Sequence, residues 1–345
     1  MRLPAEWEPQ DYVLFSFPNR AGDWGEQLDA ASRAMIYAAN LINQVTPVVI
    51  IVGDADHYAT YCDGFEGRTL MLPTNDSWVR DFGPLTVVHN GRRIARGFTF
   101  NGWGGKFEAK LDNQIPGRLA TTLLAEIPYE DIDLELEGGS IESDGNGTLM
   151  TTTTCLLNPN RNERKATLPM METKLRNHLG ANRILWLSEG ELIGDDTDAH
   201  VDTLARFLDE STIAYVRCDD EADAHFNKLQ RMERELHEFR QANGQLYDLV
   251  PLPWCPPVYS SDDGHRLPAT YANFLISNGS LFVPTYFDGS SDERGLLADD
   301  SALATLRSHG RYDVVPVPCR PFIEQHGSLH CLTMQIPAAA SERPR

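Results

Sequence analysis

The sequence predicts an α/β fold built from five helix-then-strand units, and three observations lead to this expectation. Segments with helical periodicity are each followed by a short apolar, often β-branched run of the kind found in buried strands. Further strand-like stretches lie between these units, one of them containing the Asn278-Gly279 dipeptide that is typical of a tight hairpin. No low-complexity linker divides the 345 residues, so residues 1–345 are expected to form a single domain.

Each of the five units has its own boundary signals. In chain order, the helix and the strand of each unit are expected at 25–43 and 48–52, 118–127 and 132–134, 170–179 and 183–187, 226–239 and 249–250, and up to about 309 with 314–317. Pro169 and Gly180 bracket the third helix, while Pro128 and Gly310 follow the second and the fifth. Apolar residues step by three or four through the fourth helix, which makes it the most regular of the set. The intervening strands are expected at 85–88, 147–152, 212–217, 273–276 and 281–283.

The charge balance limits the partners that this chain can have. There are 30 Lys and Arg residues against 50 Asp and Glu residues, which gives a formal net charge of −20. Such a surface repels nucleic acid and anionic membranes and attracts cations, although acidity also simply favours solubility. We therefore expect a small cationic ligand rather than nucleic acid or membrane.

The cysteines and the start of the chain indicate a cytoplasmic protein. Six cysteines are too few and too scattered for a disulfide scaffold, and none forms a CxxC metal-binding pair. No stretch approaches the roughly 20 apolar residues of a membrane span, and the first ten residues carry acid and proline where a signal peptide has a basic start.

Side chains capable of chemistry follow the predicted strands, which is where functional groups gather on α/β scaffolds. They are Asp81, Glu137, His200, Asp202 and Cys331. A thiol, a histidine and several carboxylates together indicate covalent attack on a cationic substrate. A guanidinium fits best, because carboxylates can bind its planar edge in a bidentate manner.

Each of these residues also has a structural alternative. Asp81 could form a surface ion pair with Arg80, Glu137 could open a turn, and Cys331 could be a buried apolar thiol. On a strand, His200 and Asp202 would face the same side, as a proton-transfer pair, half a metal site or a satisfied polar cluster. A metal site would need further ligands that no recognisable motif supplies, so we expect none.

The chain resembles the agmatine deiminase family of guanidino-group-modifying enzymes over almost its whole length. The resemblance rests on Pro4-Ala5-Glu6-Trp7-Glu8-Pro9, Trp78-Val79-Arg80-Asp81-Phe82-Gly83-Pro84, Phe100-Asn101-Gly102-Trp103-Gly104-Gly105-Lys106, Glu137-Gly138-Gly139-Ser140-Ile141, Cys155-Leu156-Leu157-Asn158, Asn160-Arg161-Asn162, His200-Val201-Asp202 and His330-Cys331-Leu332-Thr333. It implies a pentein-like propeller of five ββαβ modules around a pseudo-fivefold axis, with a central active site and no metal or organic cofactor.

The same resemblance implies roles for individual residues. Asp81 and Asp202 would clamp the guanidinium, and Cys331 would attack its central carbon. His200 would protonate the departing ammonia and then activate water, with Glu137 in support. The substrate-binding candidates are Trp78, which would pack on the cation, Arg80 and Asn162. Relatives commonly form oligomers, so a homo-oligomer is expected.

Departures from the family pattern leave the substrate open. Ala199 stands where the family has glycine, Glu142 where it has histidine, and Gln325-His326 within its glycine run. The leading expectation is conversion of agmatine to N-carbamoylputrescine and ammonia, a step of putrescine biosynthesis. The alternatives are a deiminase of peptidyl arginine or another small guanidine, an amidino-transferring enzyme, a metal-dependent hydrolase, and a non-catalytic protein that binds cationic amines. Glu6 and Glu8 are candidates for the distal amine by position alone.

Overall fold

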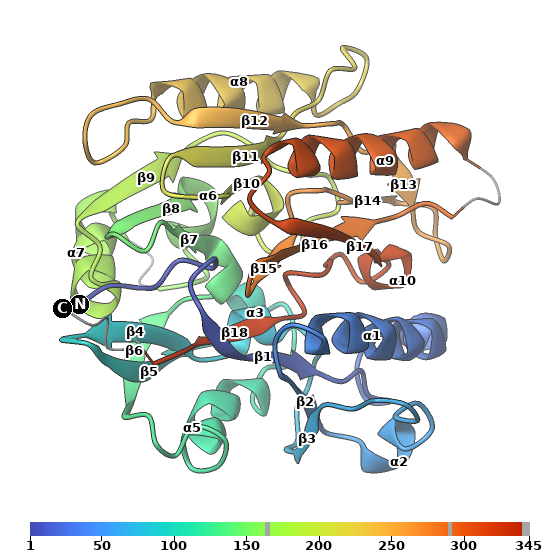
Figure 1. The fold of residues 1–345 in the computed structure, drawn as a ribbon. Helices are drawn as coiled ribbons and strands as arrows, with labels where there is room; N and C mark the ends of the chain where they lie inside the picture. Colours follow the sequence, from blue (N-terminus) through green and yellow to red (C-terminus); the bar gives the residue numbers. More distant parts are fainter. Residues whose placement is uncertain (163–165, 289–291, 340–345) are drawn as a thin grey trace.

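Five sheets of three or four strands form the framework of the computed structural model, which describes residues 1–162, 166–288 and 292–339 (Figure 1). In each sheet an antiparallel pair is followed by a helix and then by a third strand parallel to its neighbour. A helical crossover is the connection that parallel strands require. The predicted helix-then-strand units are therefore the second halves of ββαβ modules.

Four modules are continuous in the sequence. They are β4 (Leu85–His89), β5 (Arg92–Thr99), α5 (Ile115–Ala120) and β6 (Tyr129–Glu135); β7 (Ile141–Ser143), β8 (Thr148–Thr152), α7 (Leu168–Leu179) and β9 (Arg183–Leu187); β10 (Ala205–Phe207), β11 (Thr212–Val216), α8 (Phe226–Glu238) and β12 (Asp248–Leu252); and β15 (Leu275–Ser277), β16 (Ser280–Thr285), α9 (Glu293–Ser308) and β17 (Asp313–Pro318).

The fifth module is assembled from segments near the two ends of the chain. Its elements are β18 (Met334–Pro337), β1 (Gln10–Ser16), α1 (Leu28–Asn43) and β2 (Val48–Val52), and β3 (Arg68–Met71) extends the sheet. Leu14 of β1 pairs with Met334 of β18 in antiparallel register. This pairing closes the arrangement of modules and fixes the segment that precedes β18.

The expected elements are confirmed, with one error in length. α7 has proline in its first turn and ends at Gly180 in the left-handed conformation (φ 71°), as the sequence signals indicated. The helix expected to reach residue 127 ends at Ala120, and the chain continues in turns. Leu124 and Ile127 are nevertheless buried. Their helical spacing therefore reflects burial rather than a longer helix.

Tight turns and short elements complete the chain. Asn278 and Gly279 both have positive φ (43° and 89°), which is the conformation of a two-residue hairpin turn. Smaller elements that the periodicity did not reveal are α2 (Ala55–Tyr58), α3 (Val79–Phe82), α4 (Gly102–Gly105), α6 (Thr153–Leu156), α10 (Arg320–Ile323) and the pair β13 (Val258–Tyr259) and β14 (Arg266–Leu267). Among the described residues, no helix has the length and apolarity needed to cross a membrane.

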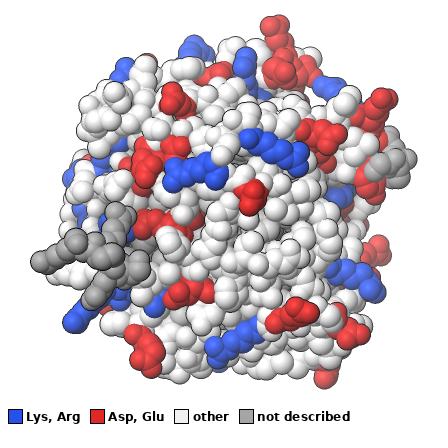
Figure 2. Space-filling view, in the orientation of Figure 1, with Lys and Arg blue, Asp and Glu red and all other residues white. Residues whose placement is uncertain are grey.

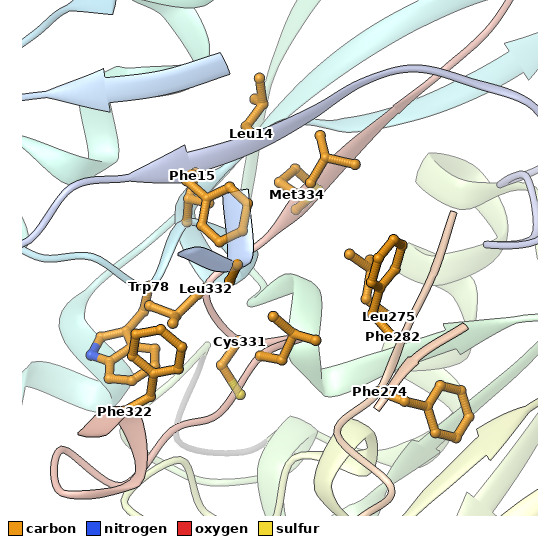
Figure 3. Close-up of a cluster of buried hydrophobic side chains, with 14 of the residues drawn as sticks. Leu14, Phe15, Trp78, Phe274, Leu275, Phe282, Phe322, Cys331, Leu332 and Met334 are labelled. Atoms are coloured by element: carbon orange, nitrogen blue, oxygen red, sulfur yellow. The ribbon is translucent and has the colours of Figure 1, made fainter. Parts of the chain in front are cut away.

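Acidic and basic side chains are interspersed over the face drawn in Figure 2, so the excess of acid forms no continuous field there. Beneath the surface, the apolar faces of the modules share a large core. The Cys331 side chain belongs to this core, as do Phe274, Phe322 and Leu332 (Figure 3). A thiol in such surroundings is desolvated, which sets the electrostatics of the site.

Candidate active site

The predicted site residues lie where the chain enters the first strand of successive modules. Asp81 in α3 precedes β4, Glu137 precedes β7, and His200 and Asp202 precede β10. Cys331 precedes β18 in the same manner. All five side chains are buried. A common position in repeated modules explains how residues far apart in sequence can share one centre.

The Cys331 thiol is held by a neighbour that sequence analysis did not assign a role. Asn273, which precedes β15, places its Nδ2 3.2 Å from Sγ, while its Oδ1 accepts the backbone N–H of Cys331 at 3.3 Å. Asp202 Oδ2 lies 3.8 Å from Sγ. Burial raises the pKa of Cys331 well above its ordinary value, and the charges of Asp202 and Asp81 raise it further. The unliganded site therefore holds a protonated thiol.

The Asp202 carboxylate has one engaged and one free oxygen. Oδ2 lies 2.7 Å from Nδ1 of His330, whereas Oδ1 is buried without a hydrogen-bond partner among the described residues. Burial alone would raise the pKa of Asp202, but the hydrogen bond and the charge of His330 hold it below its ordinary value. Asp202 therefore keeps one buried oxygen free to accept a hydrogen bond.

Asp81 is fixed by two donors. Its Oδ1 accepts the backbone N–H of Gly139 at 2.9 Å, and its Oδ2 accepts Nε1 of Trp103 at 2.9 Å. Burial raises the pKa of Asp81, and the charges of Asp202 and Glu137 add to the effect. Without a cation between them, the two buried carboxylates of Asp81 and Asp202 are thus electrostatically unfavourable.

An unusual backbone turn aims Trp103 at this carboxylate. The four residues Gly102–Gly105 all have positive φ (70°, 54°, 86° and 79°), a conformation that is uncommon for any residue other than glycine. Trp103 is the one that carries a side chain, and its indole N–H donates to Asp81. Strain of this kind tends to persist at functional sites, and the Gly-Trp-Gly-Gly sequence was the signal that could have revealed it.

His200 lies beside Asp81 and is unusually free. Both ring nitrogens are buried and have no hydrogen-bond partner within the described ranges, and Nδ1 is 3.7 Å from Asp81 Oδ1. A Cβ on Gly139 would lie 2.7 Å from His200 Nδ1 and 2.9 Å from Asp81 Oδ1. Only glycine fits between these groups, which accounts for the Gly-Gly pair after Glu137. His200 and Asp202 do not lie on a strand: His200 directly precedes a short 3-10 turn, Val201–Thr203, and Asp202 lies inside it.

Glu137 is paired with an arginine behind the histidine. Its Oε1 accepts Nε of Arg161 at 2.8 Å, and Arg161 also binds Asp198. A carboxylate oxygen of Glu137, Sγ of Cys155 and a ring nitrogen of His200 lie within 4.8 Å of one another. This group, and a second formed by Glu6, Glu142 and His330, could by distance hold a metal ion.

An arginine guanidinium already binds the carboxylates of each group. Arg161 binds Glu137 in the first group, whereas Arg206 binds both Glu6 and Glu142 in the second. In each group an arginine therefore already supplies the positive charge that a metal ion would bring.

A pocket with about 540 Å³ of open space leads to Cys331. Its walls combine aromatic rings with a group of aspartates, and it is lined by Asp23, Asp76, Trp78, Asp81, Trp103, Phe107, Asp195, Asp196, Thr197, Thr203, Gln325, His326, Gly327 and Cys331. Burial raises the pKa of Asp76 to about 6, and the nearby charge of Asp23 contributes. Aromatic faces and carboxylates both favour a cation as the occupant.

Other residues proposed from the sequence lie outside this pocket. Asn162 forms two hydrogen bonds with the backbone of Glu135, at 3.1 and 2.8 Å. The Arg80 guanidinium is buried 3.9 Å from Glu6, so the surface ion pair with Asp81 does not form. Glu6 binds Arg206 and His330, and Glu8 binds Arg2. None of these side chains lines the pocket.

The three departures from the family pattern have clear places. Ala199 has a left-handed backbone (φ 63°), which explains why glycine is favoured there. Glu142 is buried and binds Nε of Arg206. His326 lies at the pocket, with Nδ1 2.7 Å from the Gly194 carbonyl and its ring stacked on His265. Gln325 lines the pocket as well, so the departures at Gln325 and His326 are the ones that alter the pocket wall.

Comparison with known proteins finds this architecture along the full chain. Residues 2–337 match the family described as Porphyromonas-type peptidyl-arginine deiminase. A curated relative from Marinomonas sp., whose agmatine deiminase name is provisional, is 32% identical over 99% of this chain and 95% of its own.

Solved structures give the same result. A C. jejuni agmatine deiminase, a Cys-to-Ser variant with substrate bound, is 34% identical with a TM-score of 0.87, over 98% of this chain and 96% of its own. An Enterococcus faecalis agmatine deiminase is 27% identical, with a TM-score of 0.87 and the same coverage. The amidinotransferase SxtG from Microseira wollei, 10% identical with a TM-score of 0.58, shares the fold over 99% of this chain and 98% of its own.

The ring of ββαβ modules and the match along nearly every residue define the class: a hydrolase that acts on the C–N bonds of guanidino groups. The chain belongs to the Porphyromonas-type peptidyl-arginine deiminase family. The family resemblance found in the sequence is thereby confirmed.

Proposed function

We propose that this protein hydrolyses agmatine to N-carbamoylputrescine and ammonia through a covalent adduct on Cys331. The observation that carries the proposal is a pair of buried carboxylates, Asp81 and Asp202, whose charges both act on the Cys331 thiol. Asp202 Oδ1 lacks a partner among the described residues, and a guanidinium N–H would supply it. The names of the relatives point to the same substrate.

The bound cation would activate its own nucleophile. The carboxylates that raise the pKa of Cys331 would be neutralised by the guanidinium, so the thiolate becomes accessible only when substrate is present. Sγ then attacks the guanidinium carbon, and the thiol proton passes to His200. The resulting tetrahedral adduct is held by the same two carboxylates.

His200 would move the protons of both half-reactions. It first donates a proton to the departing nitrogen, so the C–N bond breaks and ammonia leaves a thiouronium on Cys331. It then takes a proton from water as the oxygen attacks the same carbon, and breakage of the C–S bond returns the thiol and releases the ureido product. Both ring nitrogens of His200 lack partners among the described residues, which leaves them available for this exchange.

The pocket wall favours a second positive charge over a carboxylate. The described lining includes the aspartates 23, 76, 195 and 196 and no Lys or Arg. Free arginine would bring an α-carboxylate toward these acids, whereas the terminal amine of agmatine would be attracted. An arginyl peptide, which the family description names, is the second candidate because it also lacks a free α-carboxylate.

The test is a joint measurement of ammonia and ureido product with agmatine, free arginine and an arginyl peptide at equal concentration. Agmatine should give the highest kcat/KM, with free arginine at least about 100-fold lower because of charge repulsion. Preference for the peptide would replace agmatine with the second candidate. Activity that disappears after treatment with a chelator and returns with metal would instead favour a metal-dependent hydrolase.

A further inference from the structure

One wall of the pocket comes from residues 194–198, a segment of turns and bends between β9 and β10. The side chain of Asp196 in this segment is 45% exposed, whereas that of Asp81 in the same pocket is 3% exposed. The thiol of Cys331 is buried as well. Residues 194–198 therefore form the outer part of the pocket, and the reacting groups lie at its inner end.

A segment outside the sheets depends on other parts of the chain for its hydrogen bonds. Arg161 Nη2 and Lys106 Nζ donate to two backbone carbonyls of this segment, at 2.9 and 2.6 Å. Nδ1 of His326 lies 2.7 Å from a third carbonyl, that of Gly194. Because a carbonyl oxygen can only accept, Nδ1 is the donor in this hydrogen bond. Three side chains from separate parts of the chain thus hold the outer wall.

Of these three side chains, His326 is the one that departs from the family pattern and also lines the pocket itself. Its ring stacks on that of His265, with centroids 5.1 Å apart and planes 16° apart, and Nε2 lies 3.6 Å from Asp196 Oδ2. The backbone of His326 is left-handed (φ 67°), a conformation that favours glycine. A ring that is kept at such a position tends to have a use that glycine could not serve.

His326 also continues directly into the loop that precedes the nucleophile. A Cβ on Gly327 would lie 2.2 Å from Cζ3 of Trp78, so this position is closed to any side chain. The next residue, Ser328, places its Oγ 2.9 Å from the hydroxyl of Tyr286. Because the loop is fixed on both sides, the histidine ring is a rigid part of the pocket rather than a mobile side chain.

We propose that His326 is a specificity-determining residue. Its ring, held between His265 and the Gly194 carbonyl, narrows the outer part of the pocket, so that a small unbranched guanidine with an amine tail enters more readily than arginine within a peptide. Peptidyl arginine branches at its α-carbon into two arms of main chain, whereas agmatine continues as a single chain. This inference rests on the proposed function and adds the reason for its substrate preference.

The test compares kcat/KM for agmatine with kcat/KM for an N-acyl-arginine amide in His326→Gly. Glycine is favoured at this φ, so the variant should fold. The ratio of the two values should fall at least about tenfold, mainly through a lower KM for the amide, while kcat for agmatine stays within about twofold. An unchanged ratio would overturn the proposal.

Asn90→Gly is the matched control. Asn90 also has a left-handed backbone (φ 50°) but lies in the turn between β4 and β5, outside the pocket lining. The substitution therefore releases the same kind of backbone strain without changing the wall, and the ratio should stay as in the natural protein. An equal fall in both variants would remove the wall as its cause.

Two measurements do not depend on turnover. Backbone amides of residues 194–198 in substrate-free protein should exchange with solvent at least about tenfold faster in His326→Gly, because one anchor of the segment is lost. Equal exchange would show that His326 does not fix this wall and would overturn the proposal. If the natural protein turned over neither compound, the proposed function would fail. The ratio of the two dissociation constants, measured by calorimetry in both proteins, would then decide whether the ring selects the ligand.

Discussion

Buried carboxylates have different partners in two regions of the molecule. One region is the pocket, and the other is the charged cluster formed by Glu6, Glu142, His330 and Arg206. In the cluster, Glu6 accepts from Arg206, His330 and the backbone N–H of Ile276. In the pocket, Asp81 faces the carboxylate of Asp202 with no arginine or lysine among the described lining residues. The two regions meet at Asp202, which bonds to His330 and whose charge acts on Asp81 and Cys331.

This difference indicates that the uncompensated carboxylates of the pocket favour the binding of a cation. A buried charge is tolerated when it is paired, and an unpaired one is retained at a cost to folding. In the cluster the carboxylates are compensated by protein cations without a ligand. In the pocket the carboxylates are compensated only when a cation binds. The charge of −20 therefore matters for function chiefly at a few aspartates, and much of the rest lies on a mixed surface.

The largest effect is expected for Cys331→Ala, which removes the nucleophile of the pocket. Ammonia release should fall by at least about 10⁴-fold, because the variant lacks the thiol that forms the adduct. The thermal unfolding midpoint should stay within a few degrees of that of the natural protein. Cys62→Ala, which changes a partly exposed thiol that does not line the pocket, should retain full activity. Turnover by Cys331→Ala would exclude the covalent route.

Stability should respond in opposite directions in the two regions. Arg206→Met leaves Glu6 and Glu142 without their guanidinium and should cost about 3–5 kcal/mol in the free energy of unfolding. Asp81→Asn removes a carboxylate whose pKa is raised by burial, and should gain about 1 kcal/mol at pH 7 while destroying activity. Urea unfolding of both variants measures the contrast. Destabilisation of equal size in both would mean that the pocket is as well paired as the cluster.

The pH dependence of ligand binding should locate the second charge of the substrate. The pKa of Asp76 is raised from 3.8 to about 6, so its contribution to folding is fully present below the lower value and is lost as the pH rises through the higher one. A bound ammonium favours the ionised carboxylate of Asp76 and so offsets the cost of burying its negative charge. In Cys331→Ala, agmatine should therefore bind about tenfold more tightly at pH 7.5 than at pH 5.

Two controls sharpen this measurement. Methylguanidine has no second amine, so calorimetric titration should show a smaller pH dependence for it than for agmatine. Asp76→Asn should reduce the agmatine dependence to the methylguanidine level. If the two ligands already respond equally in the Cys331→Ala background, Asp76 is not the site of the distal amine.

The smallest effect on catalysis is expected at Asn162. Its amide binds the Glu135 backbone, so Asn162→Ala should cost about 1 kcal/mol of stability for the lost hydrogen bonds. The KM for agmatine should stay within about twofold of the natural value. A KM raised tenfold would restore the substrate-binding role suggested by the family motif.

Sequence periodicity predicted the repeated helix and strand because each is driven by burial of one face. It could not predict that β18 completes the sheet of β1, since that pairing is non-local. The chemistry-bearing residues were recognisable as types and through the family resemblance. Sequence analysis missed three site residues, Asn273, Trp103 and Arg206. Their roles depend on contacts with residues of other modules, which the sequence alone does not show. The single domain, the homo-oligomer and the cytoplasmic location stay predictions.

The pairing of β18 with β1 also affects the order of assembly. A chain made from its N-terminus presents β1 with one side unpaired until the segment with β18 is complete. Because Cys331 is anchored immediately before that strand, the nucleophile can reach its place only in the last step of ring closure. Folding intermediates should therefore be inactive even when four modules have formed. Activity in refolding experiments should appear with the slowest phase, since pairing across nearly the whole chain has a high contact order.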